Sequence, residues 1–138
     1  MSQTAPPIAI AIVDDDASVR AALRRLCNAV GYRATAYASG REFLAALEAD
    51  PTCADCLILD THMPEMSGIE LQRHLVTSGV RIPTIVVTAD EASDAPMHYV
   101  ALGIAAYLVK PVSSDDLLAA IARSLGATPE SLVGPAHP

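Results

Sequence analysis

The chain has 138 residues, of which 51% are hydrophobic, and its formal net charge is −7 at pH 7. This length suits one domain with a sizeable core, and the acidic balance argues against binding to nucleic acid, which requires a basic face. No apolar stretch approaches the ~20 residues that span a bilayer, and no signal peptide is recognisable. We therefore expect a cytoplasmic protein that contacts neither a membrane nor nucleic acid.

Five short apolar segments along the chain indicate strands. The continuous apolar run at residues 8–13 is typical of a strand that is covered on both faces of a parallel sheet, whereas residues 32–37 give a weaker strand signal. The expected strands are residues 8–13, 32–37, 56–59, 82–87 and 105–109. The fourth contains Pro83 near its start, where the loss of one ladder donor is tolerated.

An amphipathic segment follows each expected strand and begins with residues typical of helix starts. Asp16 is a plausible N-cap of the first helix, and Ser39-Gly-Arg-Glu42 and Ser67-Gly-Ile-Glu70 match the capping-box pattern for the second and third. The fourth and fifth helices are expected to begin at 93–96 and 114–116. The apolar side of the first helix is expected to be Val19, Leu23, Leu26 and Val30, and that of the second Phe43, Leu44 and Leu47. For the third helix we expect Ile69, Leu71, Leu75 and Val76 on this side, and for the fifth Leu117, Leu118, Ile121 and Leu125.

Strands that alternate with helices predict an α/β fold, in which a five-stranded parallel sheet carries helices on both faces. Right-handed crossovers leave few topologies, and the flavodoxin-like, doubly wound strand order 2-1-3-4-5 fits this length. We expect residues 8–125 to form this domain. Residues 1–7 are expected to be an N-terminal lead, and residues 126–138 a C-terminal tail or a truncated linker.

Polar residues follow four of the expected strands at their carboxyl ends. Asp14–Asp16 follow the first strand, Asp60 the third, Thr88 the fourth and Lys110 the fifth. In this topology the first and third strands are neighbours, so their carboxylates are expected to share one crevice at the edge of the sheet. Two carboxylates about 4 Å apart repel each other by roughly 4 kcal/mol at an effective dielectric constant near 20. The cluster therefore needs a cation, and a set of oxygen ligands favours Mg²⁺.

Asp60 lies at the end of a buried strand and is followed by a proline-containing loop and a helix, which suits a nucleophile on a rigid support. A phosphoryl group that is transferred to Asp60 spreads charge over three oxygens, which Mg²⁺, Lys110 and the Thr88 hydroxyl could stabilise. The product would be a labile acyl phosphate whose added negative charge can switch a neighbouring element. Each of these residues alone is compatible with an ordinary structural role, and the prediction depends on their joint occurrence at four strand ends.

Cys53-Ala-Asp-Cys56 forms a C-x-x-C pair, but this pair precedes a strand, whereas a thioredoxin-like pair lies where a strand enters a helix. A structural zinc site would need four ligands, and the chain has no second pair. We therefore interpret the pair as one loop cysteine and one core cysteine.

Four motifs together resemble the receiver domain of two-component response regulators, the CheY-like family. In the order and spacing of that family, the matching segments are Val13-Asp14-Asp15, Leu59-Asp60 with Met63-Pro64-Glu65-Met66-Ser67-Gly68, Val87-Thr88-Ala89 and Tyr107-Leu108-Val109-Lys110-Pro111. The Val-Asp-Asp-Asp run and Tyr37-Ala-Ser-Gly-Arg-Glu-Phe43 further resemble FixJ-type receivers, which precede helix-turn-helix domains in nitrogen-fixation-type regulators. The resemblance extends over nearly the whole chain, from about residue 8 to residue 125.

The resemblance implies a role for each residue of the acidic site. Asp60 would be the phosphoacceptor for a sensor histidine kinase, and the domain would catalyse only its own phosphorylation and dephosphorylation. Mg²⁺, or Mn²⁺, would be bound by Asp15, Asp60, the main-chain carbonyl of His62 and, through water, Asp14. The Lys110–Pro111 peptide bond is expected to be cis, which an X-Pro bond tolerates.

The resemblance also implies which residues respond to the phosphoryl group. Thr88 would bond it, Lys110 would pair with it, and Tyr107 would turn inward on activation. His62 and Asp90 would flank the phosphoryl position and modulate how fast water removes the group.

Receivers of this type use the fourth helix, fifth strand and fifth helix as a face for homodimers or effector proteins. On this face we expect Met97, His98, Tyr99, Leu102 and Tyr107. Methionine and tyrosine suit an adaptable interface. Met97 and Leu102 are equally compatible with a position in the core.

Three alternatives remain open. A phosphatase of the haloacid dehalogenase type would use Asp14 as its nucleophile, and Thr88, Lys110 and Asp115-Asp116 echo its later motifs. However, Asp115-Asp116 opens a helix, and the loop after Asp60 goes unexplained. A flavin carrier would need a phosphate-binding loop after the first strand, where this chain has three aspartates. A pseudo-receiver that acts by docking alone is disfavoured by the intact acidic set.

Overall fold

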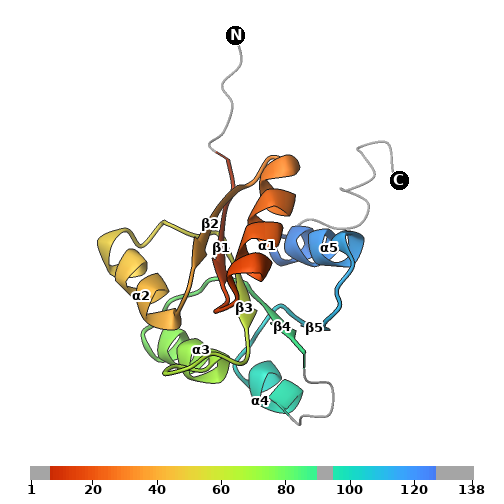
Figure 1. Ribbon diagram of the computed structural model, residues 1–138. Helices are drawn as coiled ribbons and strands as arrows, with labels where there is room; N and C mark the ends of the chain where they lie inside the picture. The colour runs from red at the N-terminus through yellow and green to blue at the C-terminus, as the bar shows by residue number, and fades with distance from the viewer. Residues whose placement is uncertain (1–6, 90–94, 127–138) are drawn as a thin grey trace.

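The structure, a computed structural model, describes residues 7–89 and 95–126 (Figure 1). Its strands are β1 (Ala9–Val13), β2 (Arg33–Tyr37), β3 (Cys56–Asp60), β4 (Thr84–Thr88) and β5 (Ala106–Val109). Its helices are α1 (Ala17–Ala29), α2 (Gly40–Ala49), α3 (Gly68–Thr77), α4 (Ala95–Ala101) and α5 (Ser114–Ser124). Each strand therefore begins and ends within two residues of its expected position. The expected start of the fourth helix, at Ser93 and Asp94, lies outside the described residues.

The five strands form one parallel sheet in the order β2-β1-β3-β4-β5, which confirms the expected flavodoxin-like topology. Val13 pairs with Leu59, and Asp60 pairs with Val87. The last residues of β4 and β5 are likewise partners. This register brings the carboxyl ends of β1, β3, β4 and β5 to one edge of the sheet, so the polar residues that end these strands become neighbours.

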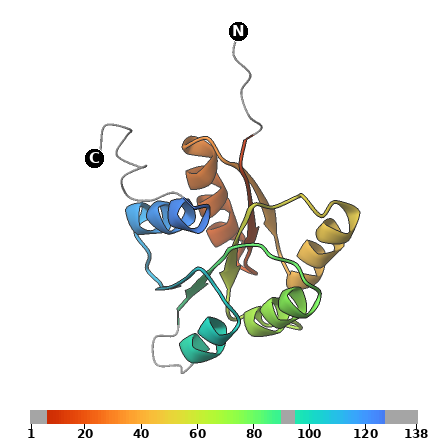
Figure 2. The same ribbon diagram turned by 180° about the vertical axis from the view of Figure 1, so that it is seen from behind.

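Helices cover both faces of the sheet, with α1 and α5 on one side and α2 and α3 on the other (Figures 1 and 2). Successive side chains of a strand point to opposite faces, so each strand contributes to two cores. The first core includes Ile10, Ile12, Ile58 and Ile85 of the sheet with Cys27 of α1 and Leu117 and Ile121 of α5. The second includes Ala11, Val13, Leu57 and Leu59 of the sheet with Phe43 and Leu47 of α2 and Leu71 and Leu75 of α3. None of the described helices has the length and apolar character needed to cross a membrane.

The capping box that the sequence predicts for α3 is complete. Ser67 Oγ accepts a hydrogen bond from the Glu70 N–H at 3.3 Å, and Glu70 Oε1 accepts one from the Ser67 N–H at 2.8 Å. At α2 only half of the predicted box forms. Ser39 Oγ accepts from the Glu42 N–H at 3.2 Å, but the Glu42 carboxylate accepts from the N–H of Ala38, one residue before the cap.

Two residues that the helical spacing places on the core side are instead exposed. Val30 is 51% exposed because α1 ends before it and Val30 is the C-cap, and Val76 of α3 is 48% exposed. On α1, the fully buried residue is Cys27, which packs in the first core. The prediction of the apolar stripe is therefore wrong at these two helix ends.

The cysteines are all free, and their burial agrees with the expected pair of a loop and a core residue. Cys53 is half-buried before β3, and Cys56 is fully buried in the strand. The Cys56 sulfur lies 3.3 Å from the Ser124 hydroxyl of α5. Burial raises the pKa of the Cys56 thiol, which suits a packing role.

Candidate functional site

Three carboxylates meet at the carboxyl edge of the sheet. Asp60 ends β3 and is 7% exposed, Asp14 follows β1 and is 3% exposed, and Asp15 is exposed. One oxygen of each carboxylate lies within 4.8 Å of an oxygen of the other two. The carboxylates that follow the first and third strands therefore lie together as expected, and the three acidic residues have a geometry that can ligate one cation.

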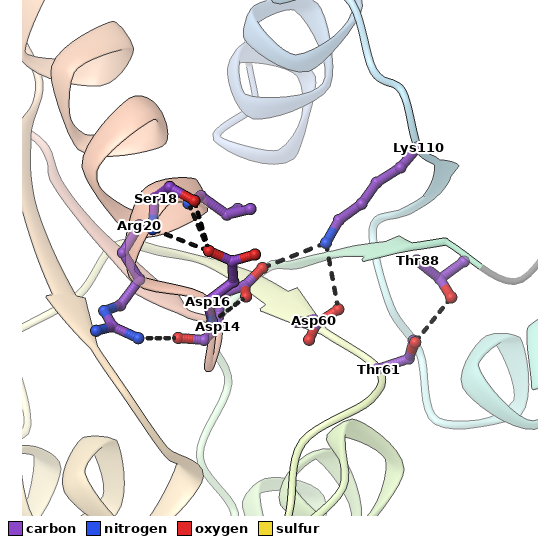
Figure 3. Close-up of polar contacts among 9 residues, drawn as sticks. Asp14, Asp16, Ser18, Arg20, Asp60, Thr61, Thr88 and Lys110 are labelled. Atoms are coloured by element: carbon purple, nitrogen blue, oxygen red, sulfur yellow. Dashed lines mark hydrogen bonds and ion pairs between the residues drawn. The ribbon is translucent and has the colours of Figure 1, made fainter.

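Lys110, which directly follows β5, brings a positive charge to two of these carboxylates. Its Nζ lies 3.4 Å from Asp14 Oδ2 and 3.6 Å from Asp60 Oδ1 (Figure 3). It is the only lysine of the chain. The peptide bond between Lys110 and Pro111 is cis, as expected.

The loop after β1 is held by hydrogen bonds that fix Asp14. Its Oδ1 accepts from the Asp16 N–H at 2.9 Å, and its main-chain carbonyl accepts from Arg20 Nη1 at 2.8 Å. Asp16 caps α1, as predicted, by accepting from the N–H and the hydroxyl of Ser18. The contact of Arg20 with the acidic loop was not predicted from the sequence.

The three carboxylates of the site outnumber the two cationic side chains, Lys110 and Arg20, that are described beside them. Burial raises the pKa of the Asp60 carboxyl above its usual value, the charge of Asp14 raises it further, and the Lys110 ammonium opposes both effects. The Lys110 ammonium pairs with two of the three clustered carboxylates. Oxygen ligands at an open, partly exposed edge are the chemistry that Mg²⁺ prefers, so the residues present fit this ion.

Thr88 ends β4 and is hydrogen-bonded to a residue that the sequence did not single out. Thr61 Oγ1 donates to Thr88 Oγ1 at 2.7 Å, and both residues are buried. Thr61 follows Asp60, so its side chain comes from the opposite side of the same strand end. The sequence offered one signal for this contact, namely that the residue directly after Asp60 is a threonine, which is β-branched and carries a hydroxyl.

Tyr99 of α4 is not on the outer face where the sequence places it. It is 2% exposed, and its ring packs against Tyr107 with centroids 5.9 Å apart. Burial raises the pKa of the Tyr99 hydroxyl, and the nearby Tyr107 and Asp60 contribute to this shift. On the same helix, Met97 and Val100 are 74% and 67% exposed, so Met97 is a surface residue and not part of the core.

Of the two residues that are expected to modulate the loss of the phosphoryl group, His62 lies within the described part of the chain. His62 is exposed and lines a cavity next to Tyr99 and Tyr107. Asp90 lies outside the described residues. The roles expected for the His62 carbonyl and for Asp90 therefore stay predictions.

Comparison with known proteins decides the family. The family model for the response regulator receiver domain matches residues 10–122. The chain belongs to the response regulator receiver family. Its fold and its acidic cluster are those of a receiver.

Several response regulators resemble this receiver over most of its length. TmoT from Ectopseudomonas mendocina is 38% identical over 123 residues, which cover 88% of this chain and 54% of TmoT. TodT from Pseudomonas putida is 36% identical over 123 residues, covering 88% of this chain and 52% of TodT. The chain thus spans about half the length of these curated relatives.

Solved receiver structures agree with the fold. A response regulator receiver protein from Burkholderia phymatum is 41% identical, with a TM-score of 0.77 over 88% of this chain and 97% of that one. The structure named FixJ-N is 28% identical, with a TM-score of 0.80 over 90% of this chain and 98% of that one. The similarity to FixJ-N is consistent with the FixJ-type resemblance of the sequence.

The match to the receiver family argues against the alternative of a haloacid dehalogenase-type phosphatase. In this receiver Asp115 and Asp116 lie in the first turn of α5 and are exposed. The acidic cluster consists instead of Asp14, Asp15 and Asp60. This cluster includes Asp60, which the phosphatase hypothesis leaves without a role.

Proposed function

We propose that this receiver accepts a phosphoryl group on Asp60 from the phosphohistidine of a sensor histidine kinase. The observation that carries the proposal is the buried Asp60 carboxylate at the strand end, 3.6 Å from Lys110 and clustered with Asp14 and Asp15. An Asp60 oxygen forms the new P–O bond while the P–N bond of the donor breaks, and the departing imidazole takes up a proton. The product is an acyl phosphate on Asp60.

The residues around Asp60 divide the work of stabilising the charge on the phosphoryl oxygens. The Lys110 ammonium pairs with one oxygen, and the Thr88 hydroxyl donates to another. Asp15, Asp60 and the His62 carbonyl, with Asp14 through water, would hold a Mg²⁺ or Mn²⁺ ion, which supplies positive charge to the phosphoryl group when it is bound. His62 and Asp90 would set how easily water reaches the phosphorus.

Phosphorylation would change the face formed by α4, β5 and α5. Thr88 moves toward the phosphoryl group, and Tyr107, which packs on Tyr99, follows it inward. The exposed Met97 and Val100 offer this face an apolar surface for a second copy or an effector protein.

The output of the receiver would come from a further domain of a longer regulator or from a separate effector protein. The curated relatives are about twice as long as the matched region. We therefore propose that residues 8–125 either form the receiver part of a longer regulator or act on a separate effector protein. Residues 126–138 would then be a linker or tail. The domain would be a phosphoacceptor and not an enzyme with a diffusible substrate, and its three free cysteines suit the reducing cytoplasm.

Removal of the metal is expected to prevent phosphoryl acceptance. With acetyl phosphate and Mg²⁺, intact-mass spectrometry should show a single phosphoryl adduct, and a chelator should abolish it. Asp15→Asn should slow adduct formation about tenfold or more, since it removes an exposed ligand of the proposed metal site. The matched control is Asp115→Asn, which changes another exposed aspartate, on α5, and should react at the original rate. Equal rates for both variants would contradict the assignment of Asp15 as a metal ligand.

A further inference from the structure

The hydroxyl groups of Thr61 and Thr88 form a direct bond beside the acidic site. Thr61 follows β3 and is 8% exposed, whereas Thr88 ends β4 and is 1% exposed. Thr61 Oγ1 donates to Thr88 Oγ1 at 2.7 Å. Figure 3 shows the two hydroxyls pointing at each other, while the Asp60 carboxylate points toward Lys110. The Thr88 hydroxyl is thus held by Thr61, on the side of the strand ends away from Lys110.

The bond faces the space beneath α4. Thr61 and Thr88 both line a cavity of about 210 Å³, together with Tyr99 and Tyr107. Asp60 is not among the described residues that line this cavity. A movement of the Thr88 hydroxyl toward a phosphoryl group on Asp60 would therefore take it out of the cavity and away from Thr61.

Breaking this bond has a cost because both groups are buried. A hydrogen bond is stronger in a low-dielectric interior than in water, and a buried donor that loses its acceptor is left with an uncompensated desolvation cost. When Thr88 turns toward the phosphoryl group, the Thr61 hydroxyl loses its acceptor. The bond therefore favours the arrangement without a phosphoryl group.

We propose that Thr61 is a positioning residue that holds the Thr88 hydroxyl in the unphosphorylated arrangement and thereby lowers the affinity of the receiver for a phosphoryl group on Asp60. The proposal rests on the proposed function, because Thr88 must bind that group. Thr61, the residue directly after the phosphoacceptor, thus restrains the movement of Thr88 on phosphorylation. Without the Thr61 hydroxyl, the activated arrangement is easier to reach.

The test uses beryllofluoride with Mg²⁺, a stable mimic of a phosphoryl group on a carboxylate, and measures its affinity by titration calorimetry. Thr61→Val removes the hydroxyl and keeps the β-branched shape. It is expected to bind beryllofluoride about fivefold more tightly, which is the scale of one net hydrogen bond. Thr61→Ala removes the same hydroxyl with less bulk and replaces Thr61→Val if the valine is not accommodated. Unchanged or weaker binding by the folded variant would overturn the proposal.

Two controls separate the hydrogen bond from the packing. Thr61→Ser keeps the hydroxyl and should bind beryllofluoride as the original chain does. Thr84→Val is the matched control, because Thr84 is a buried threonine at the opposite end of β4 whose hydroxyl donates to the Ile82 carbonyl at 3.0 Å. It should leave the affinity unchanged, and tighter binding by either control would overturn the proposal.

A double-variant cycle identifies Thr88 as the group through which Thr61 acts. In a Thr88→Val background, Thr61→Val should no longer tighten binding, since the hydroxyl that it restrains is gone. NMR adds a second measurement: in the free Thr61→Val chain, the Thr88 side-chain resonances should shift part of the way toward their beryllofluoride-bound positions. If the original chain binds no beryllofluoride, the proposed function fails together with this inference. If it binds and Thr61→Val has no effect, only the inference fails.

Discussion

Replacing Lys110 by glutamine is expected to slow phosphoryl acceptance at Asp60 about 100-fold, the typical cost of removing one charge-stabilising group from a transition state. The Lys110 ammonium already lies 3.4 Å from Asp14 and 3.6 Å from Asp60, so it is in place before the phosphoryl group arrives. No other lysine exists in the chain that could take over its role. The glutamine amide can donate a hydrogen bond but brings no positive charge, and the rate should therefore not be restored by hydrogen bonding alone.

The rate of adduct formation from acetyl phosphate with saturating Mg²⁺ measures this effect. Arg123→Gln is the matched control, because it removes an exposed positive charge from the last turn of α5 and should leave the rate unchanged. The thermal unfolding of Lys110→Gln should be followed in Mg²⁺, since loss of the ammonium leaves Asp14 and Asp60 without their cationic partner. A rate within threefold of the original, in a folded variant, would show that Lys110 has no part in the transfer.

Gly68→Ala is expected to destabilise the fold by about 2 kcal/mol through overpacking, which should lower the Tm by several degrees. A Cβ at Gly68 would lie 2.5 Å from the Tyr99 hydroxyl and 2.6 Å from the main-chain carbonyl oxygen of Asp60. Tyr99 is buried against Tyr107, and the carbonyl belongs to the strand end that presents the phosphoacceptor. Neither neighbour can move without disturbing α4 or β3, so phosphoryl acceptance should also slow.

Gly40→Ala is the matched control for this substitution, because both glycines are the first residue of a helix and follow a serine N-cap. The Cβ at Gly40 would meet the sulfur of Met66 at 2.9 Å, at the flexible end of a side chain. Gly40→Ala should therefore change the Tm by no more than a few degrees, which thermal unfolding followed by circular dichroism can measure for both variants. Equal Tm values for the two variants would contradict the close packing described at Gly68.

The topology and the main site residues could be predicted because local patterns determine them. Short apolar segments identified four of the strands and a weaker pattern identified β2, and the position of Asp60 at the end of one of these segments placed its carboxylate at the edge of the sheet. The clustering of Asp14 with Asp60 then followed from the adjacency of β1 and β3. The roles proposed for Lys110 and Thr88 came from their occurrence together with Asp60 at the strand ends, and the family resemblance implied the same roles.

The features that could not be predicted depend on contacts between distant segments. α4 has only seven residues, so its apolar residues give no clear periodicity, and the burial of Tyr99 follows from the space beside Tyr107. The bond between Thr61 and Thr88 joins residues 27 positions apart, and its existence depends on the register of β3 and β4. At α2, the Glu42 carboxylate accepts from the Ala38 N–H and not from the Ser39 N–H of the predicted capping box. This difference similarly depends on how the chain leaves β2.

Intact-mass spectrometry of the chain and of its Asp60→Asn and Asp14→Asn variants, each incubated with acetyl phosphate and Mg²⁺, tests the central claim most directly. We predict that the original chain gains one phosphoryl group and that Asp60→Asn gains none. Asp14→Asn should still be modified on Asp60, although more slowly. An adduct that persists in Asp60→Asn and disappears in Asp14→Asn would place the nucleophile after the first strand and contradict the account.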